Sequence, residues 1–477
     1  MSRLVITNAA VATVDTADWR AGSGTEYAGG HVVVDGGIIT AVGQGAAPAG
    51  ALPEGAAPDG SAPDGPGRRL DGHGALLVTP GLVNTHHHLY QWATRGLAQE
   101  ATLFEWLVAL YPVWAGLDDQ IEHAAAGAGL AALARSGCTT VADHHYVYPR
   151  GAGDLNAALT SAAHRVGVRL QLVRGSMDYG QSRGGLPPDE LVEDTDAALQ
   201  GTEADIAAYH DPAPDAMVRV SVGPCSPFSA SRRLMAEAAE LGRRHSVRLH
   251  THLAETMDEE EHCLAQFGRT PLDYADELGW LGPDVWLAHG IHFTDDAVER
   301  LGSTGTGIAH CPSSNARLGA GIARVRDLLE AGSPVGLGVD GAASNEHGGL
   351  GEELRQSLLL ARLRGGPRAL TARQALWLGT MGGARCLGRE AELGSIEVGK
   401  QADLAVWRLD GLGQAGIADP VAALVFGQLP RLELLLVGGR VVVERGQLST
   451  VDESALAAEL AVASRRMRVG EGQPPTP

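Results

Sequence analysis

The sequence has few of the features that mark secreted or membrane proteins. Its five cysteines are odd in number and include no C-x-x-C pair, so we expect reduced thiols rather than a disulfide framework. The N-terminal segment has no basic region followed by a long apolar run, and no apolar stretch is long enough to span a bilayer. These absences predict a cytoplasmic protein with no membrane partner.

Positive charge is scarce relative to negative charge. Lys and Arg total 37 against 57 Asp and Glu, which gives a net charge of −20. Such a surplus of negative charge repels polyphosphate, so we expect no nucleic-acid partner. The sequence also has no G-x-x-x-x-G-K-[ST] motif and no convincing G-x-G-x-x-G after a strand, which excludes phosphate-loop and dinucleotide chemistry. A small neutral ligand fits this composition best.

The 477 residues are more than one compact domain usually needs. Residues 1–75 and 389–477 contain short Val- and Ile-rich runs between Gly and Asp, which are typical of antiparallel strands. We predict that both termini build one small discontinuous β-sandwich, with a terminal helix after its last strand. Residues 44–69 are rich in Pro, Gly and Ala and predict a mobile surface loop.

The central segment, residues 76–388, alternates short apolar runs with Ala- and Leu-rich helical segments, which predicts βαβ units. Eight such runs can be counted, and eight parallel strands close a (β/α)₈ barrel. We therefore predict an α/β fold with a catalytic TIM barrel, whose strand C-termini meet where catalysis occurs. The runs are residues 75–88, 138–148, 168–177, 217–225, 247–255, 285–293, 307–315 and 334–341.

Most of these runs end in His, Asp, Glu, Cys or Asn. In the first run, His86 and His88 lie on one face because strand side chains alternate, so both can chelate one cation. Burial of two unligated imidazoles at this spacing would be costly. Imidazoles with a carboxylate suit Zn²⁺, and Fe²⁺ fits the same donors. Later runs add the polar residues His252, Glu255, His289 and Asp340.

Other polar residues have a structural explanation that is at least as good. A single histidine in a strand is more often a hydrogen-bonded core residue than a ligand. We interpret four histidines in this way: His87, His144, His145 and His310. By itself Glu255 would pass for a surface acid, and Asp340 for a helix N-cap. The helical spacing of Phe104, Leu107, Val108, Tyr111 and Trp114 predicts a packed helix face, with a cover over the pocket as the alternative.

The motifs PGLVNTHHH, HTHLAE, LAHG and VDG, in this order and spacing, resemble the amidohydrolase superfamily in its nucleobase-deaminase and triazine-hydrolase branch. The resemblance implies a metal-dependent hydrolase whose metal ligands are His86, His88, His252 and Asp340. It implies that Glu255 is the proton shuttle and that His289 polarises water or substrate beside the metal. Because the fourth run ends in Gly223-Pro224-Cys225-Ser226, without a lysine that could be carbamylated, we expect one divalent ion per subunit.

These implied roles are physically coherent. A divalent cation lowers the pKa of a bound water toward ~7, which supplies hydroxide at neutral pH. Asp340 would accept the water proton, and Glu255 would protonate a ring nitrogen and then the leaving amine. His289 would stabilise charge that develops on the attacking oxygen.

Four further segments point to a substrate class: PGLVNTHHHLYQ, LFEWLVALYPVW, RGSMDYGQSRGGLPPDELVEDTD and GPCSPFSAS. They resemble the bacterial 8-oxoguanine deaminases, which implies conversion of 8-oxoguanine to urate and ammonia within purine metabolism. Gln91 stands where guanine deaminases have a purine-binding glutamine, and its amide can both donate and accept. Further expected pocket residues are Trp92, Cys225 and Asn315, with Tyr179 and Phe228 as other loop candidates.

Three alternatives remain open from the sequence. The same layout resembles triazine hydrolases, so the substrate could be an s-triazine that loses an amine or chloride. It could also be another heterocycle such as guanine, isoxanthopterin or cytosine. A non-catalytic scaffold with the same barrel is the alternative of a different class. The resemblance further implies a homodimer or a larger homo-oligomer.

Overall fold

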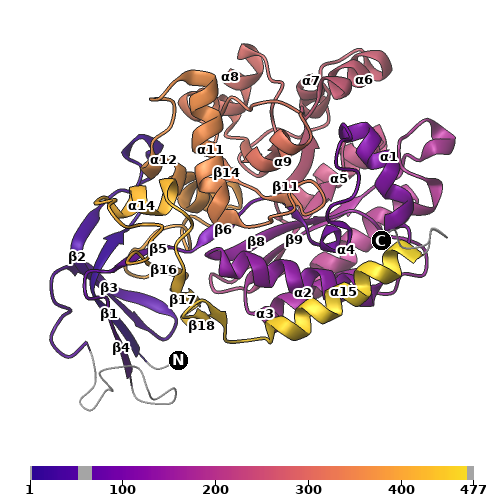
Figure 1. Cartoon of the computed structure of the whole chain (residues 1–477). Coiled ribbons are helices and arrows are strands. Elements are labelled where there is room, and N and C mark those ends of the chain that lie inside the picture. The colour runs from indigo at the N-terminus through magenta and orange to yellow at the C-terminus, as the bar shows by residue number, and fades with distance from the viewer. Residues whose placement is uncertain (1–2, 52–66, 470–477) are drawn as a thin grey trace.

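The computed structural model describes residues 3–51 and 67–469, which form a large α/β barrel with a separate sheet at one side (Figure 1). Most of the predicted loop 44–69 lies outside the described residues, although Gln44 ends one strand and Gly67 begins another. No helix in these ranges has both the length and the apolar character needed to cross a membrane.

Eight parallel strands close the barrel in the order β10-β11-β12-β13-β14-β6-β8-β9. Each strand lies within one of the eight predicted runs, so the predicted (β/α)₈ barrel is confirmed. The bounds are β6 (Leu82–Asn84), β8 (Cys138–His145), β9 (Arg169–Ser176), β10 (Val218–Pro224), β11 (Leu249–Leu253), β12 (Val285–His289), β13 (Gly307–His310) and β14 (Val335–Leu337).

The first predicted run contains three strands rather than one. β5 (Leu76–Pro80) belongs to the separate sheet, β6 belongs to the barrel, and β7 (His87–His88) pairs with β15 (Asp340–Gly341) in a two-stranded ladder. The break falls at Pro80-Gly81, where proline has no N–H to continue a ladder. A side chain at Gly81 would clash with Thr139, so only glycine lets the chain pass this closely into the barrel.

Strands from both ends of the chain form the separate sheet, which has nine strands. β1, β2 and β3 pair in the expected antiparallel manner, but β1 pairs in parallel with β4 and β5. β5 joins the two halves because it also pairs antiparallel with β16. Besides β5, the strands are β1 (Arg3–Ala12), β2 (Glu26–Asp35), β3 (Ile38–Gln44), β4 (Gly67–Asp71), β16 (Leu404–Arg408), β17 (Leu432–Val437), β18 (Arg440–Glu444) and β19 (Gln447–Leu448).

This sheet has an apolar core of its own, which includes Ile6, Val32, Leu404 and Leu434. A much larger cluster of buried apolar residues lies in and around the barrel. The predicted domain limits, 1–75, 76–388 and 389–477, stay a prediction, and β5 lies on the sheet side of the contacts described above.

Helices occupy the segments between the barrel strands and surround the barrel (Figure 1). The helices are α1 (Leu103–Trp114), α2 (Asp119–Arg135), α3 (Leu155–Val166), α4 (Thr195–Tyr209), α5 (Arg232–Arg244), α6 (Met257–Phe267), α7 (Pro271–Glu277), α8 (Asp295–Thr304), α9 (Pro312–Arg317), α10 (Val325–Ala331), α11 (Leu350–Gly365), α12 (Ala372–Trp377), α13 (Gly383–Cys386), α14 (Pro420–Phe426) and α15 (Glu453–Val469). Shorter helical turns are η1 (Trp19–Ala21), η2 (Leu89–Thr94), η3 (Gln181–Arg183), η4 (Asp189–Leu191) and η5 (Leu378–Gly382). The terminal helix α15 packs along α2.

Helix α1 differs in detail from the predicted apolar face. It begins after Thr102, whose capping box with Glu105 satisfies backbone N–H groups of the first turn. Tyr111 and Trp114 are buried as expected, but Val108 is 57% exposed. The buried side also includes Leu103 and Trp106, so the apolar face of α1 is rotated from the predicted one.

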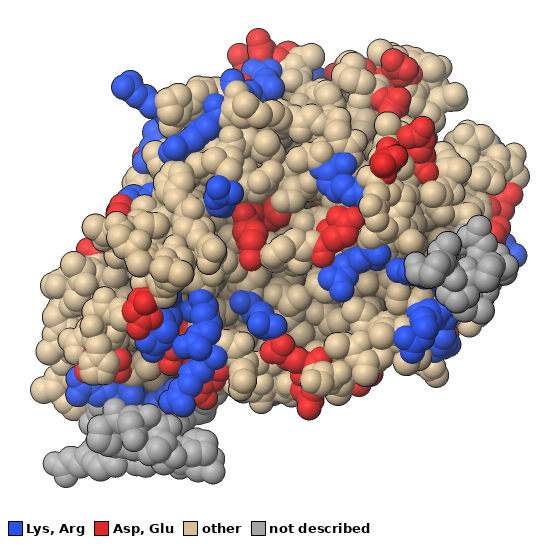
Figure 2. All heavy atoms as spheres, in the orientation of Figure 1, with Lys and Arg blue, Asp and Glu red and all other residues tan. Residues whose placement is uncertain are grey.

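Charged side chains of both signs are interspersed on the face shown in Figure 2. Arg300, for example, lies 2.6 Å from Asp273 and 2.5 Å from Asp276. Exposed pairs of this kind contribute little to stability individually, typically about 0–1 kcal/mol. The five cysteines are all buried, and none of them pairs with another in the part of the chain that the structure describes.

Candidate active site

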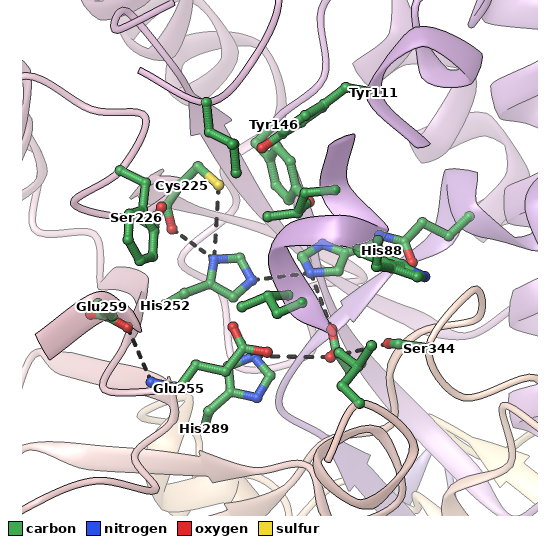
Figure 3. Close-up of a pocket in the computed structure, with 18 residues that line it drawn as sticks. His88, Tyr111, Tyr146, Cys225, Ser226, His252, Glu255, Glu259, His289 and Ser344 are labelled. Carbon is green, nitrogen blue, oxygen red and sulfur yellow. Dashed lines mark hydrogen bonds and ion pairs between the residues drawn. The ribbon is translucent and has the colours of Figure 1, made fainter. Parts of the chain in front are cut away.

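A pocket opens where the C-terminal ends of several barrel strands meet (Figure 3). It encloses about 570 Å³, its open mouth included, which suits a small ligand. Helix α1 contributes Leu103, Trp106, Leu107 and Tyr111 to its wall. This segment therefore forms part of the pocket wall as well as a packed helix, and the alternative of a lid stays a prediction.

Two of the predicted ligands lie at β7: His86 directly precedes this strand and His88 ends it. The ladder between β7 and β15 pairs His87 with Asp340, and the Asp340 N–H donates to the His86 carbonyl at 3.0 Å. This register places the Asp340 carboxylate beside both imidazoles. Its Oδ1 lies 3.3 Å from His86 Nε2 and 3.2 Å from His88 Nε2.

The remaining predicted residues are His252 on β11, Glu255 just after β11, and His289 at the end of β12. His252 on β11 has its Nε2 atom 3.2 Å from His88 Nε2. His289 ends β12, and its Nε2 lies 3.6 Å from Glu255 Oε2 and 3.9 Å from Asp340 Oδ2. One ligand atom from each of His86, His252, His289 and Asp340 lies within 4.8 Å of the others. The structure thus brings together all the residues predicted as ligands or catalytic groups.

The orientation of three imidazoles fits a divalent cation. His88 Nδ1 donates to the His144 carbonyl at 2.7 Å, and His252 Nδ1 donates to the Cys225 carbonyl at 2.6 Å. His86 Nδ1 donates to His250 Nε2 at 2.8 Å, while His250 Nδ1 donates to the Trp286 carbonyl. Each bond fixes the ring and leaves Nε2 free to ligate, as second-sphere partners of metal-bound histidines do.

The pKa values separate the two carboxyl groups of the site. Burial raises the pKa of Glu255 well above its usual value, and the charge of Asp340 adds to that effect. Burial also raises the pKa of Asp340, but the adjacent imidazoles of His86, His88 and His289 outweigh it and hold the pKa well below its usual value. The surroundings therefore favour the protonated form of Glu255 and the ionised form of Asp340.

Three residues of the site adopt a left-handed backbone although none is glycine. The φ angles are 54° at Ala254, 72° at His289 and 63° at Asp340. Such conformations cost non-glycine residues about 1–3 kcal/mol each and persist only where the surroundings impose them. All three follow or end a strand at the pocket, so this strain coincides with the placement of the functional side chains.

The predicted substrate-binding residues divide into two groups. Gln91 and Cys225 line the pocket, as does the loop candidate Phe228. Trp92 instead donates from Nε1 to His87 Nε2 at 3.2 Å, and Asn315 accepts at 3.0 Å from His289 Nδ1. Trp92 thus contacts His87, and Asn315 contacts His289. Trp92, Asn315 and the loop candidate Tyr179 are not among the residues that line the described pocket.

Sequence reasoning missed three residues that support the site. His250 holds the His86 ring, Ser314 donates to Asp340 Oδ2 at 2.6 Å, and Glu259 lines the pocket. A signal existed for His250, because it is two residues from His252 on β11 and alternation puts both on one face. No comparable signal marked Ser314, which follows β13 and meets Asp340 only in the folded chain.

The four histidines interpreted as core residues are all buried. His144 Nε2 donates to the Gly223 carbonyl at 2.7 Å, and His145 Nε2 donates to the Val147 carbonyl at 3.0 Å. His144 also lies close enough to His88 and His252 for the three to form a possible ligand group. Its hydrogen bond to Gly223 uses the Nε2 atom, while Nδ1 has no hydrogen-bond partner among the described residues, so the interpretation of His144 as a core residue stays a prediction.

A sequence model of the amidohydrolase family matches residues 77–442, from β5 to β18. The chain belongs to the amidohydrolase family. This amidohydrolase is 45% identical to the 8-oxoguanine deaminase of Pseudomonas aeruginosa over 450 residues, which cover 94% of this chain and 97% of the relative. It is 39% identical to an isoxanthopterin deaminase from an unknown prokaryotic organism, with 83% of this chain and 86% of the relative covered.

Solved structures lead to the same family. The atrazine chlorohydrolase of Arthrobacter aurescens TC1, in complex with zinc, superposes on this amidohydrolase with a TM-score of 0.87 and 32% identity. The match covers 97% of this chain and 100% of that chain. The predicted family, the barrel and a hydrolase that acts on C–N bonds are confirmed, and the scaffold alternative is not supported. The His and Asp donors described above fit the metal dependence of the family.

Proposed function

We propose that this amidohydrolase is a metal-dependent deaminase that hydrolyses the free oxopurine base 8-oxoguanine to urate and ammonia. Water supplies the oxygen that replaces the exocyclic amine, and the amine leaves as ammonia. The observation that carries the reaction type is the presence in one pocket of two carboxyl groups, Glu255 and Asp340, which both lie near His289 Nε2 and whose surroundings shift their pKa values in opposite directions. Groups with pKa values pushed apart in this way mark acid and base partners.

The metal ligands in this proposal are His86, His88, His252 and Asp340. Zn²⁺ is the expected ion, and Fe²⁺ fits the same donors. When bound, a divalent ion supplies Lewis acidity and lowers the pKa of water toward ~7. Two of the three imidazoles, His86 and His252, suit this role because burial lowers their pKa well below the usual value, and neutral imidazole is the ligating form.

The proton transfers fall to Asp340 and Glu255. The ionised Asp340 accepts a proton from the attacking water, and Ser314 holds its Oδ2 through a 2.6 Å hydrogen bond. Glu255 starts protonated, so it can donate to a ring nitrogen as the oxygen adds to the neighbouring carbon. Glu255, then ionised, takes the second proton of the attacking water and passes it to the amine, which leaves as ammonia. The proton held by Asp340 then restores Glu255, which makes Glu255 a general acid used twice.

His289 is positioned to stabilise the attacking oxygen. Asn315 Oδ1 accepts from Nδ1, which fixes the orientation of the ring. The other nitrogen, Nε2, faces both Glu255 Oε2 and Asp340 Oδ2. His289 is thus close to the site where charge develops.

Recognition of a flat, polar heterocycle suits the pocket wall. Tyr111, Tyr146 and Trp106 provide aromatic surface for a planar ring. Gln91 Oε1 is buried and accepts no hydrogen bond from any described residue. A buried amide oxygen of this kind gains from a ligand N–H, and the identity of 45% with the 8-oxoguanine deaminase supports that base as the ligand.

A panel of bases tests the substrate. Purified enzyme loaded with Zn²⁺ would be assayed for ammonia release from 8-oxoguanine, guanine, isoxanthopterin, cytosine and a hydroxytriazine. We expect kcat/KM for 8-oxoguanine to exceed the others by at least about 10-fold, because unpaired buried polar groups discriminate strongly between bases. A preference for isoxanthopterin or the triazine would assign the pocket to those alternatives.

A cytoplasmic location, a place in purine metabolism and a homodimer or larger homo-oligomer belong to the same proposal. They stay predictions, which cell fractionation, growth on 8-oxoguanine as nitrogen source and light scattering would test in turn.

A further inference from the structure

We propose that Glu259 is a positioning residue that holds Glu255 in its catalytic direction. This inference rests on the proposed role of Glu255. Glu259 is 1% exposed, and its two carboxylate oxygens accept successive backbone N–H groups. Figure 3 draws the bond to Glu255. Oε1 accepts from Ala254 at 3.0 Å, and Oε2 accepts from Glu255 at 3.1 Å.

These two bonds act on the strained part of the backbone. Ala254 has a φ of 54°, a left-handed conformation that disfavours residues with a Cβ. Its carbonyl accepts from the N–H groups of Ile291 at 2.9 Å and His292 at 3.1 Å. Glu259 thus binds the peptide groups on both sides of Ala254, and the segment after β12 binds the second of them as well. Glu255 is the next residue, so this turn sets the direction of its side chain.

The position of Glu259 in helix α6 shows that helix capping does not account for these bonds. Thr256 is the N-cap of α6 and Glu259 is the third helical residue, which is the T-x-x-E pattern of a capping box. In a capping box the glutamate would accept from the N-cap N–H. Here both oxygens accept from the two residues before Thr256, and the Thr256 hydroxyl has no hydrogen-bond partner among the described residues.

The test compares two variants of the full-length, metal-loaded enzyme. Glu259→Gln keeps the volume but replaces one acceptor oxygen by an NH₂ group that cannot accept, so one of the two bonds is lost. Asp258→Asn is the matched control, because it removes the same charge from the first turn of α6 at an exposed position. We expect Glu259→Gln to lower kcat by about 10- to 100-fold with KM and metal content little changed, and the control to match the wild type.

A double variant separates positioning from general damage. If Glu259 acts through Glu255, then Glu255→Gln with Glu259→Gln should turn over no more slowly than Glu255→Gln alone, within about 3-fold. Multiplicative losses would overturn the inference. Full activity of Glu259→Gln beside an inactive Glu255→Gln would overturn it while leaving the proposed function intact.

Two further results complete the test. An active Glu255→Gln enzyme would refute the proposed shuttle and the inference with it. If Glu259→Gln does not fold, as judged by thermal unfolding, Glu259→Asp replaces it, because aspartate keeps the charge and is too short to hold both N–H groups. The same kcat loss with unchanged KM is expected, and wild-type kcat in this variant would contradict the inference.

Discussion

Two buried groups of imidazoles and carboxylates lie close together in this barrel, and they differ in access and in hydrogen bonding. The first is the pocket group, formed by His86, His88, His252, Glu255, His289 and Asp340. The second is the inner group, formed by Glu122 of α2 with Asp143 and His145 of β8, whose potential ligand atoms also lie within 4.8 Å of one another. None of the three inner residues is among those that line the described pocket.

The partners of the two groups explain the difference. In the pocket group each ligand imidazole is fixed through Nδ1, and Asp340 is held by Ser314. In the inner group Asp143 accepts from the Leu89 N–H at 2.6 Å, but neither oxygen of Glu122 has a hydrogen-bond partner among the residues described. Burial raises the pKa of Glu122 well above its usual value. Similar residue types therefore give an ionised and oriented Asp340 in the pocket group and two carboxyls with raised pKa values, Glu122 and Asp143, in the inner group.

The largest expected effect comes from one isosteric change in each group. Asp340→Asn removes a ligand charge and the proton acceptor, so we expect turnover to fall by about 10³-fold or more, with loss of bound metal. Glu122→Gln removes a carboxyl whose protonated form is favoured by burial, so metal content and turnover should stay within about 2-fold of wild type. Metal analysis and ammonia release on both purified variants check the pair.

The comparison would break if Glu122→Gln lost a metal equivalent that Asp340→Asn retained. The inner group would then be a second ion site, and the single ion per subunit that we expect would be wrong. Equal loss in both variants would mean that the groups fold as one unit.

The pocket group could be predicted from sequence largely because strand geometry is local. Alternation in a strand places His86 and His88 on one face without any knowledge of the fold. The same rule would have found His250 beside His252. Eight apolar runs with polar ends then bring these residues to one end of a barrel, although the motif resemblance was needed to assign a role to each residue.

Other features depend on contacts between distant segments, which no local pattern contains. Pro80 marks a break, but only the folded chain shows that β5 joins β16, more than three hundred residues later. Trp92 follows Gln91 directly, yet the helical turn η2 directs one toward His87 and the other to the pocket. The inner group belongs to this class as well, since Glu122 and Asp143 meet only when α2 packs on β8.

A smaller effect is expected in the pH dependence of the free energy of unfolding, to which Asp143 of the inner group contributes. Burial raises the pKa of Asp143 from 3.8 to about 7. Folding therefore takes up a proton at Asp143 between pH 3.8 and about 7. The stabilisation that protonated Asp143 contributes to the folded protein is fully present below pH 3.8 and is lost as pH rises through about 7. One such group gives a slope of up to ~1.4 kcal/mol per pH unit.

Asp143→Asn should remove that slope, because asparagine keeps the oxygen that accepts from Leu89 and does not titrate. The free energy of unfolding of the metal-loaded protein, measured in denaturant across this pH range, should fall less steeply in the variant than in wild type. Parallel curves would show that Asp143 is ionised in the folded protein, which would make the inner group resemble the pocket group after all.

The smallest effect is expected at Cys225, which lines the pocket and lies beside a ligand. Its carbonyl, rather than its thiol, holds His252 at 2.6 Å, while Sγ is 4.0 Å from the same Nδ1 atom. Burial raises the pKa of the thiol to about 12, so no thiolate is available as a ligand at neutral pH. Cys225→Ser should therefore retain the metal and keep kcat within about 3-fold of wild type, since one small neutral group replaces another. Loss of metal from this variant would add the Cys225 sulfur to the ligand set, and the pocket group would then include this residue, which follows β10.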